Sequence, residues 1–187
     1  MINKKTSIMA MALAAVAAIM LALLAGCGSQ TGDANDLLHQ SSDLISSVKD
    51  KVQQVDTLLD QASQQSNLRQ LDTEKQTLSQ ANDLLNQAIP QIEEAKAKVD
   101  QAARLNISSD FRKYLQARSR ALDAARSLRQ TQQQKVMLMM SDPGFDQPDT
   151  ARKFADLQNT ENSLNAKVQQ AESQADQIAH AHPDEIR

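Results

Sequence analysis

The side chain with the clearest potential for chemistry is the thiol of Cys27, the only cysteine among the 187 residues. A thiol becomes a strong nucleophile when it loses its proton, so it can be alkylated or acylated. A single cysteine forms no internal disulfide and excludes a zinc site built from several cysteines. Cys27 stands where a long apolar run ends and the small polar residues of the segment 28–35 begin. The role of its thiol therefore depends on the residues in front of it.

Residues 1–26 have the three regions of a secretory signal peptide. Lys4 and Lys5 give the start a positive charge, residues 8–25 form an apolar run, and small residues end it. The run of about 18 residues is also at the lower limit for crossing the ~30 Å hydrocarbon core of a bilayer, so an uncleaved transmembrane anchor is the alternative. In both cases the two lysines stay inside and residues 28–187 lie outside.

The sequence Leu24-Ala25-Gly26-Cys27 resembles the lipobox of bacterial lipoproteins, and all four positions match. The resemblance covers the signal segment alone. It implies that the thiol receives a diacylglyceryl group and that cleavage between Gly26 and Cys27 makes the cysteine the mature N-terminus. We therefore expect a lipid-anchored protein of the bacterial cell envelope. Its membrane partner would be reached through the acyl chains on Cys27, palmitate among them, on the extracytoplasmic face of the cell membrane.

The signal peptide divides the chain into three parts. Residues 1–26 would be removed, and the loss of Lys4 and Lys5 would change the net charge from -3 to -5. Residues 27–35 are expected to hold the lipidated cysteine and a flexible linker, because they are small and polar. Residues 36–187 are expected to form the folded domain. Its mild acidity predicts no binding to nucleic acid.

Histidines and methionines are the other candidates for a site, in this case for a metal. His39 starts the first helix and His180 and His182 end the last, so the expected topology brings them to the same end of the fold. However, His180 and His182 point to different faces of a helix, whereas helical ligand pairs sit three or four positions apart. The run VMLMM at 136–140 could bind a soft metal such as copper. We expect no metal at either place, with the histidines at helix ends and the methionines packed into the end of the fold.

No residue pattern typical of an enzyme is present. The sequence has no nucleophile elbow, no glycine-rich phosphate loop and no H-E-x-x-H zinc motif. Its carboxylates are spread along helix surfaces, as on solvated faces. We therefore expect neither enzyme activity nor a cofactor.

The composition favours helices for the elements that carry these residues. Four Gly, four Pro, no Trp and one Tyr argue against a β-sandwich or barrel. Apolar residues recur at helical spacing, and alternation at period two is absent. The strongest seam is a heptad repeat made of Leu71, Leu78, Leu85, Ile92 and Val99, the last four followed three residues later by Ala81, Ala88, Ala95 and Ala102. Alanine at the second core position lets a neighbouring helix approach closely.

Three breaks divide the domain into helices. The segment Ser141–Asp149 contains two prolines and a glycine. Asn106 is expected to adopt the left-handed conformation before a Ser or Asp cap. The seam changes phase near residues 64–67, where Asn67 with Gln70 resembles a capping box. Pro90 lies on the outward face, so we expect it to kink its helix without ending it.

The expected helices span residues 36–64, 67–105, 109–140 and 149–181. Short connections make neighbours antiparallel, which predicts an all-α fold, an up-down-up-down four-helix bundle with coiled-coil-like packing. An extended antiparallel coiled coil is the alternative if the first break is absent.

Two charged residues interrupt the apolar faces of the last two helices. Arg129 lies on the face that carries Leu122, and folding the chain about the Ser141–Asp149 loop places it opposite Glu161. We predict a structural ion pair between Arg129 and Glu161 that fixes the register of these helices.

Basic residues gather around the turn near residue 106, at the end of the bundle that carries Cys27. They are Arg104, Arg112, Lys113, Arg118 and Arg120. An anionic membrane would attract such a cluster. We expect instead that it is solvated or is neutralised by acids such as Glu172 and Asp176.

The function expected from these features is that of a membrane-tethered, extracytoplasmic lipoprotein without catalytic activity, acting through protein or cell-envelope contacts. The alternative is a sensory helical bundle with a ligand or metal site between its helices. Few aromatic residues and a seam filled by Leu and Ala leave little room for such a pocket.

Overall fold

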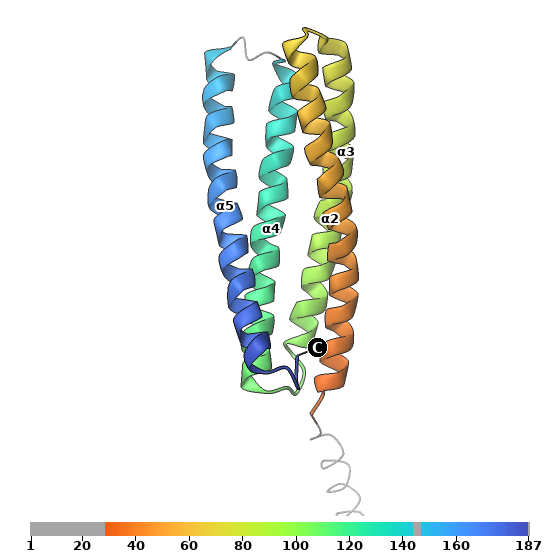
Figure 1. Ribbon diagram of the computed structural model, residues 1–187, viewed down its shortest axis with the longest axis vertical. Coiled ribbons are helices and arrows are strands. Elements are labelled where there is room, and N and C mark those ends of the chain that lie inside the picture. Colours follow the sequence, from red (N-terminus) through yellow and green to blue (C-terminus); the bar gives the residue numbers. More distant parts are fainter. Residues whose placement is uncertain (1–28, 144–146, 187) are drawn as a thin grey trace, which may run out of the picture.

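The computed structural model describes residues 29–143 and 147–186, and every regular element in these ranges is a helix. The helices are α2 (Thr31–Asn67), α3 (Leu71–Ala102), α4 (Ser109–Ser141) and α5 (Pro148–Ala181). They run alternately up and down along one long axis (Figure 1). The predicted four-helix bundle is confirmed. Gly26 and Cys27 lie outside the described residues, as does the rest of the segment 1–28.

The heptad seam of α3 forms the middle of the core. Its large residues from Leu78 to Val99 and its alanines from Ala81 to Ala102 are at most 1% exposed. They belong to two apolar clusters, one toward the end where α2 begins and one toward the α2–α3 turn. The first seam residue, Leu71, is 44% exposed, because it is the first residue of α3 and projects at the turn. Pro90 is exposed and α3 continues through it.

The turn between α2 and α3 exists, three residues later than predicted. Arg69 has a φ of 58°, in the left-handed region that usually holds glycine. The amide of Gln70 donates to the carbonyl of Gln65, and the amide of Arg69 donates to that of Ser66. This is the Schellman pattern of helix ends. Asn67 is the last residue of α2 and caps no helix.

Replacing Arg69 with glycine should raise the free energy of unfolding by about 0.5–1 kcal/mol. A side chain in the left-handed region costs about 1–2 kcal/mol, and the greater freedom of glycine in the unfolded chain offsets part of the gain. Urea denaturation followed by circular dichroism measures the change. The variant Arg69→Ala is the control, because it removes the side chain but keeps Cβ, and it should show no gain. Equal stabilisation by both variants would contradict the argument.

The linker before the first helix is shorter than predicted, because α2 begins at Thr31 rather than near residue 36. Ala34 is fully buried, so its burial holds the first turn of the helix in place. Just before the helix, the backbone amide of Gln30 donates to the carbonyl of Asn106, and the Gln30 side chain accepts from the Asn106 amide. Asn106 does not adopt the predicted left-handed conformation. Ser108 does cap α4, accepting from the amide of Phe111.

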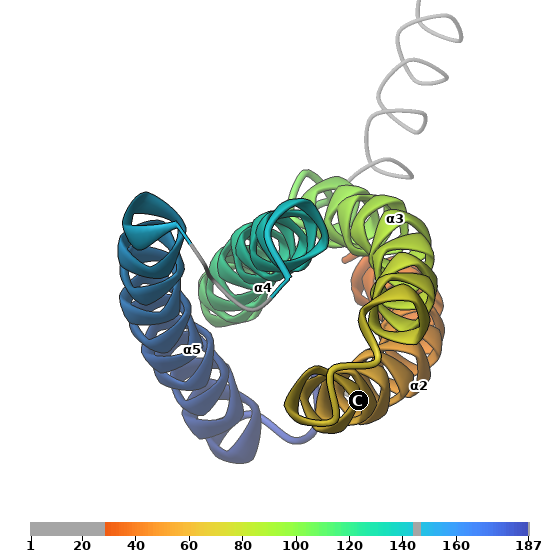
Figure 2. The ribbon, with the colours of Figure 1, turned by 90° about the horizontal axis from the view of Figure 1, so that it is seen from above.

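The helices form an open arc. Each packs against its neighbour in the chain, but no Cα atom of α5 lies within 8 Å of one in α2. Seen from above, α4 and α5 lie to one side of α3 and α2 curls back from the other (Figure 2). The side between α2 and α5 is therefore open. As a consequence α5 has few buried residues: only Thr150, Ala171 and Ala175 among its 34 residues, against ten in the 32 residues of α3.

The residues after α5 bridge this open side at one end of the bundle, where Figure 1 shows the C-terminus beside the start of α2. The Asn35 side chain donates to the carbonyl of Glu185, and the Ser108 hydroxyl donates to the Glu185 carboxylate. Ile186 is buried in the cluster that contains Ala34 and Phe111. We call residues 182–186 the C-terminal tail. It links α5 to α2 at the end from which the chain leads back to Cys27.

Within the described ranges, no helix combines the length and apolar character needed to cross a membrane.

Candidate functional site

The inner face of α4 carries charged and polar residues that face the open side between α2 and α5. Arg118 and Arg129 are half-buried and line a pocket of about 230 Å³ together with Ile45, Val52 and Glu172. The Nε atom of Arg118 is buried without a hydrogen-bond partner. Both arginines thus stand on an apolar face, as the spacing indicated, and the open side of the bundle is what accommodates them.

Glu161 of α5 is the acid that meets these α4 residues, but its direct cation is Lys135. The Lys135 Nζ atom lies 2.5 Å from Glu161 Oε2, and the two side chains are 13% and 12% exposed. Arg129 reaches Glu161 through Gln132: Arg129 donates to Gln132 Oε1 at 2.6 Å, and Gln132 Nε2 donates to Glu161 Oε1 at 2.9 Å. The two predicted partners therefore share one network without a direct contact.

The register of α5 explains why a lysine takes the expected place of Arg129. Folding the chain symmetrically about its loop sets residue 129 against residue 161. The observed α4–α5 hydrogen bonds join Arg120 to Gln174 and Lys135 to Gln158. These pairs are offset from the symmetric register by about one helical turn, roughly 5 Å. The sequence locates the loop but does not fix the register of the two helices that it connects.

Burial lowers the pKa of Arg129 below its ordinary value, while the nearby carboxylates of Asp56 and Glu161 act in the opposite direction. Burial also raises the pKa of Asp56, which Arg129 lowers and Glu161 raises. The half-buried arginine is thus placed between acids of α2 and α5. These charges of α2, α4 and α5 influence one another electrostatically across the open side, although α2 and α5 do not touch.

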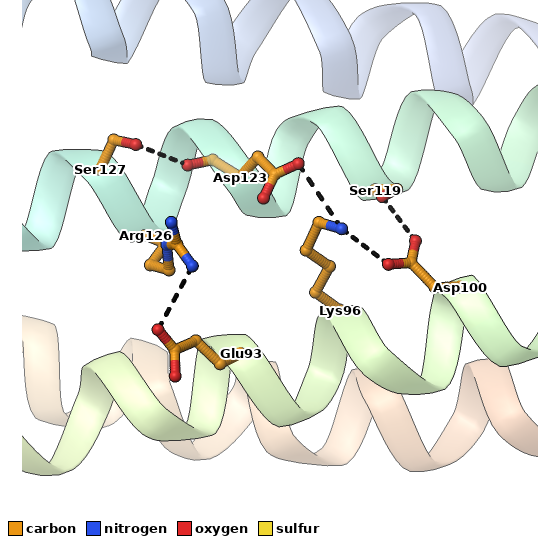
Figure 3. Close-up of polar contacts among 7 residues, drawn as sticks. All are labelled: Glu93, Lys96, Asp100, Ser119, Asp123, Arg126 and Ser127. Atoms are coloured by element: carbon orange, nitrogen blue, oxygen red, sulfur yellow. Dashed lines mark hydrogen bonds and ion pairs between the residues drawn. The ribbon is translucent and has the colours of Figure 1, made fainter.

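A second polar set fixes α3 against α4 (Figure 3). Arg126 lies 3.3 Å from Glu93, Lys96 lies 3.6 Å from Asp123, and Ser119 donates to Asp100 at 2.7 Å. From one pair to the next, the residue number rises along α3 by as much as it falls along α4. All three pairs therefore share one antiparallel register. Lys96 also binds Asp100 at 2.6 Å within α3. The set is structural, since its members bind one another.

The pKa values of this set reflect its pairing. The hydrogen bond to Asp100 raises the pKa of Lys96 above its ordinary value. Burial alone would raise the pKa of Asp100, but hydrogen bonds from Lys96 and Ser119 outweigh it and hold the pKa below 3.8. A carboxyl with a lowered pKa stabilises the fold above its unfolded-state pKa, and this stability is lost as the pH falls through its folded-state pKa.

Replacing Asp100 with asparagine should therefore lower the free energy of unfolding at pH 7 by about 0.5–1 kcal/mol, the range for partly exposed ion pairs. The difference from the parent protein should shrink below pH 3.8, as Asp100 itself becomes protonated. Urea denaturation at a series of pH values tests this. Asp83→Asn, which removes an exposed carboxylate of α3 outside this set, serves as control. A difference that persists unchanged at the lowest pH would contradict the assignment.

The histidines do not come together. His39 and His180 are exposed, and His182 lies 3.7 Å from Asp110. In residues 29–143 and 147–186, no three side chains of His, Cys, Asp or Glu gather as they would around a metal ion. Met139 and Met140 pack against the apolar cluster near the α2–α3 turn, which is the packing role predicted for the VMLMM run.

Two members of the basic cluster around the α3–α4 turn, Arg112 and Lys113, make local bonds. Arg112 donates to the carbonyls of Ala103 and Leu105 and so satisfies the end of α3. Lys113 binds Asp110 at 2.8 Å, which lowers the pKa of that carboxyl. The acid that neutralises part of the cluster is thus Asp110 of α4 rather than the acids of α5 named from the sequence.

Sequence reasoning missed Glu74, the most deeply buried acid of the described chain, which is 2% exposed. A signal for it is present. In α3 an alanine follows each large seam residue by three positions from Leu78 onward, and Glu74 occupies that position after Leu71. An acid in the small core position of a heptad indicates either a buried partner or a site. Lys135 was missed because its contact with Glu161 depends on the register of α5 against α4, which the sequence does not show.

Comparison with known proteins adds no relative: no family model matches the chain, and neither a curated protein nor a solved structure resembles it closely enough to count as a match. The function must therefore be argued from the residues themselves.

Proposed function

We propose that the protein is a bacterial lipoprotein, held by a diacylglyceryl group on Cys27 at the extracytoplasmic face of a membrane, where its helical bundle acts through protein or cell-envelope contacts. The observation that carries the proposal is the sequence Leu24-Ala25-Gly26-Cys27 at the end of an apolar run with lysines before it.

The start of the bundle supports a close tether. Gln30 is hydrogen-bonded to Asn106 at the end of the bundle where the C-terminal tail docks. Three residues of chain from Cys27 to Gln30 reach at most about 10 Å. A lipid on Cys27 would therefore hold this end against the headgroups, with the long axis of the bundle leading away from the membrane.

The far end of the bundle carries the exposed apolar residues that a partner could contact. Leu68 is 68% exposed, Met137 is 57% exposed, and Leu71 stands beside the same turn as Leu68. The 37 residues of α2 separate this end from the tether by about 55 Å. A bundle of this length would present its apolar tip well beyond the membrane surface.

Mass spectrometry of the protein extracted from its native membrane tests the proposal. The N-terminal peptide should begin at Cys27 and carry the added mass of a diacylglyceryl group. A peptide that begins at Met1 with an unmodified thiol would show that the apolar run is retained as an anchor and that the proposal is wrong.

A ligand-binding sensory bundle is the second candidate. It is favoured by a pocket of about 480 Å³ at the far end, which contradicts the expectation that the seam leaves little room. A protein could combine both roles, with the tether placing the pocket outside the membrane.

A further inference from the structure

The pocket lies between α2, α4 and α5, beside the α2–α3 turn. It has a volume of about 480 Å³, within the range of small-molecule sites. Leu59 of α2, Met139 of α4 and Phe154 of α5 give it apolar walls. Glu74 of α3 and Asp60 of α2 contribute carboxylates to its lining.

One carboxylate oxygen of Glu74 has no hydrogen-bond partner. Its side chain is almost completely buried, and its Oε2 atom has neither exposure to solvent nor a hydrogen bond. Buried polar atoms in folded proteins nearly always have a partner, and an unpaired one lowers the stability of the fold. A carboxylate oxygen accepts hydrogen bonds and attracts positive charge. The missing group is therefore a donor, and a cationic one fits best.

Lys135 lines the same pocket but does not supply that group. Its ammonium is bound to Glu161 Oε2 and to Gln158 Oε1 at 2.6 Å, and it lies 4.9 Å from the centre of the Phe154 ring. These contacts direct it to α5, away from Glu74. The positive charge of Lys135 is balanced by Glu161, so the carboxylates of Glu74 and Asp60 leave the pocket with an excess of negative charge.

We propose that this pocket binds a small organic ammonium ion, with its charged head donating to Glu74 and its apolar part packed against Leu59, Met139 and Phe154. The volume suits a free small molecule with several carbon atoms. A metal ion would need more ligands than the pocket gathers, since no group of three metal-binding side chains occurs in the described part of the chain. The proposal concerns the far end of the bundle and is independent of lipid attachment at Cys27.

Isothermal titration calorimetry tests it with the full protein from the membrane, reconstituted in phosphatidylcholine nanodiscs, and with empty nanodiscs as blank. The probe is 2-phenylethylamine, and 2-phenylethanol is its neutral counterpart of nearly equal shape. The amine should bind about tenfold or more tightly than the alcohol, because both can donate to Glu74 but only the ammonium brings a positive charge to the carboxylate. Glu74→Gln should weaken amine binding by a similar factor and leave the alcohol unchanged.

Two further variants separate charge from shape. Glu94→Gln removes an exposed carboxylate of the same helix and should leave amine binding as in the parent protein. Ser63→Trp places a large side chain at the rim from an exposed position of α2, so it should abolish binding while the fold, followed by circular dichroism, persists. Absence of amine binding, equal binding of amine and alcohol, or amine binding that survives both Glu74→Gln and Ser63→Trp would overturn the proposal.

Discussion

Replacing Lys135 with methionine should lower the free energy of unfolding by about 3 kcal/mol. The change removes the cation of a pair in which both side chains are nearly buried, and it leaves the Glu161 carboxylate with only the Gln132 amide as a bonded partner. Removing one member of a buried ion pair costs about 3–5 kcal/mol, because the remaining charge is left uncompensated. We take the lower end, since Arg129 stays nearby and attracts Glu161. Urea denaturation at pH 7 measures the loss.

A second substitution shows whether the loss comes from the unpaired charge. In Lys135→Met combined with Glu161→Gln, the glutamine oxygen can still accept from Gln132, and no charge remains unpaired, so most of the stability should return. The matched control is Lys113→Met, which breaks the pair with Asp110, where the lysine side chain is 65% exposed, and should cost at most about 0.5 kcal/mol. A loss from Lys135→Met as small as that of the control would disprove the buried-pair interpretation.

Replacing Cys27 with serine should abolish lipidation of the protein. A hydroxyl is far less nucleophilic than a thiolate at neutral pH, so the diacylglyceryl group would not be transferred. The chain should then be found as uncleaved precursor, which still begins at Met1, or as protein released from the membrane. Fractionation of cells, with mass spectrometry of the N-terminal peptide, measures the outcome.

Two controls show whether the position of the thiol matters. Ser29→Ala leaves the residues from Leu24 to Cys27 intact and should be processed like the parent protein. Combining Cys27→Ser with Ser29→Cys keeps one thiol in the same region but moves it two residues, and it should remain unprocessed. Lipidation of this shifted cysteine would show that the thiol is modified without recognition of the four-residue motif.

The helices of this fold could be predicted because the signals for them are local. The heptad seam from Leu78 to Ala102 depends only on spacing along one chain, and burial of those residues confirms it. The α2–α3 turn was placed too early because its left-handed residue is Arg69, a type that carries no turn signal. A helix end that is held by backbone hydrogen bonds alone leaves no signal in the amino-acid sequence.

Features that depend on the relation between helices could not be predicted in the same way. A seam shows which face of α5 is apolar, but not that α4 is the one helix in the described ranges against which α5 packs closely along its length. The hydrogen bonds between α4 and α5 are offset from the symmetric register by about one helical turn, and Glu161 pairs directly with Lys135 instead of Arg129. Glu74 could have been identified as an exception in its heptad, but its lack of a partner depends on what α4 and α5 place around it.

The open side between α2 and α5 gives the bundle two levels of cooperativity. Because α5 buries only three of its residues, its detachment exposes far less core than the separation of α3 from α2. Elements with few buried contacts open at lower free energy than the rest of a protein and exchange their amide hydrogens first. The C-terminal tail secures α5 beside the start of α2. Opening of α5 should thus begin at its N-terminal half, where Phe154 forms a wall of the pocket.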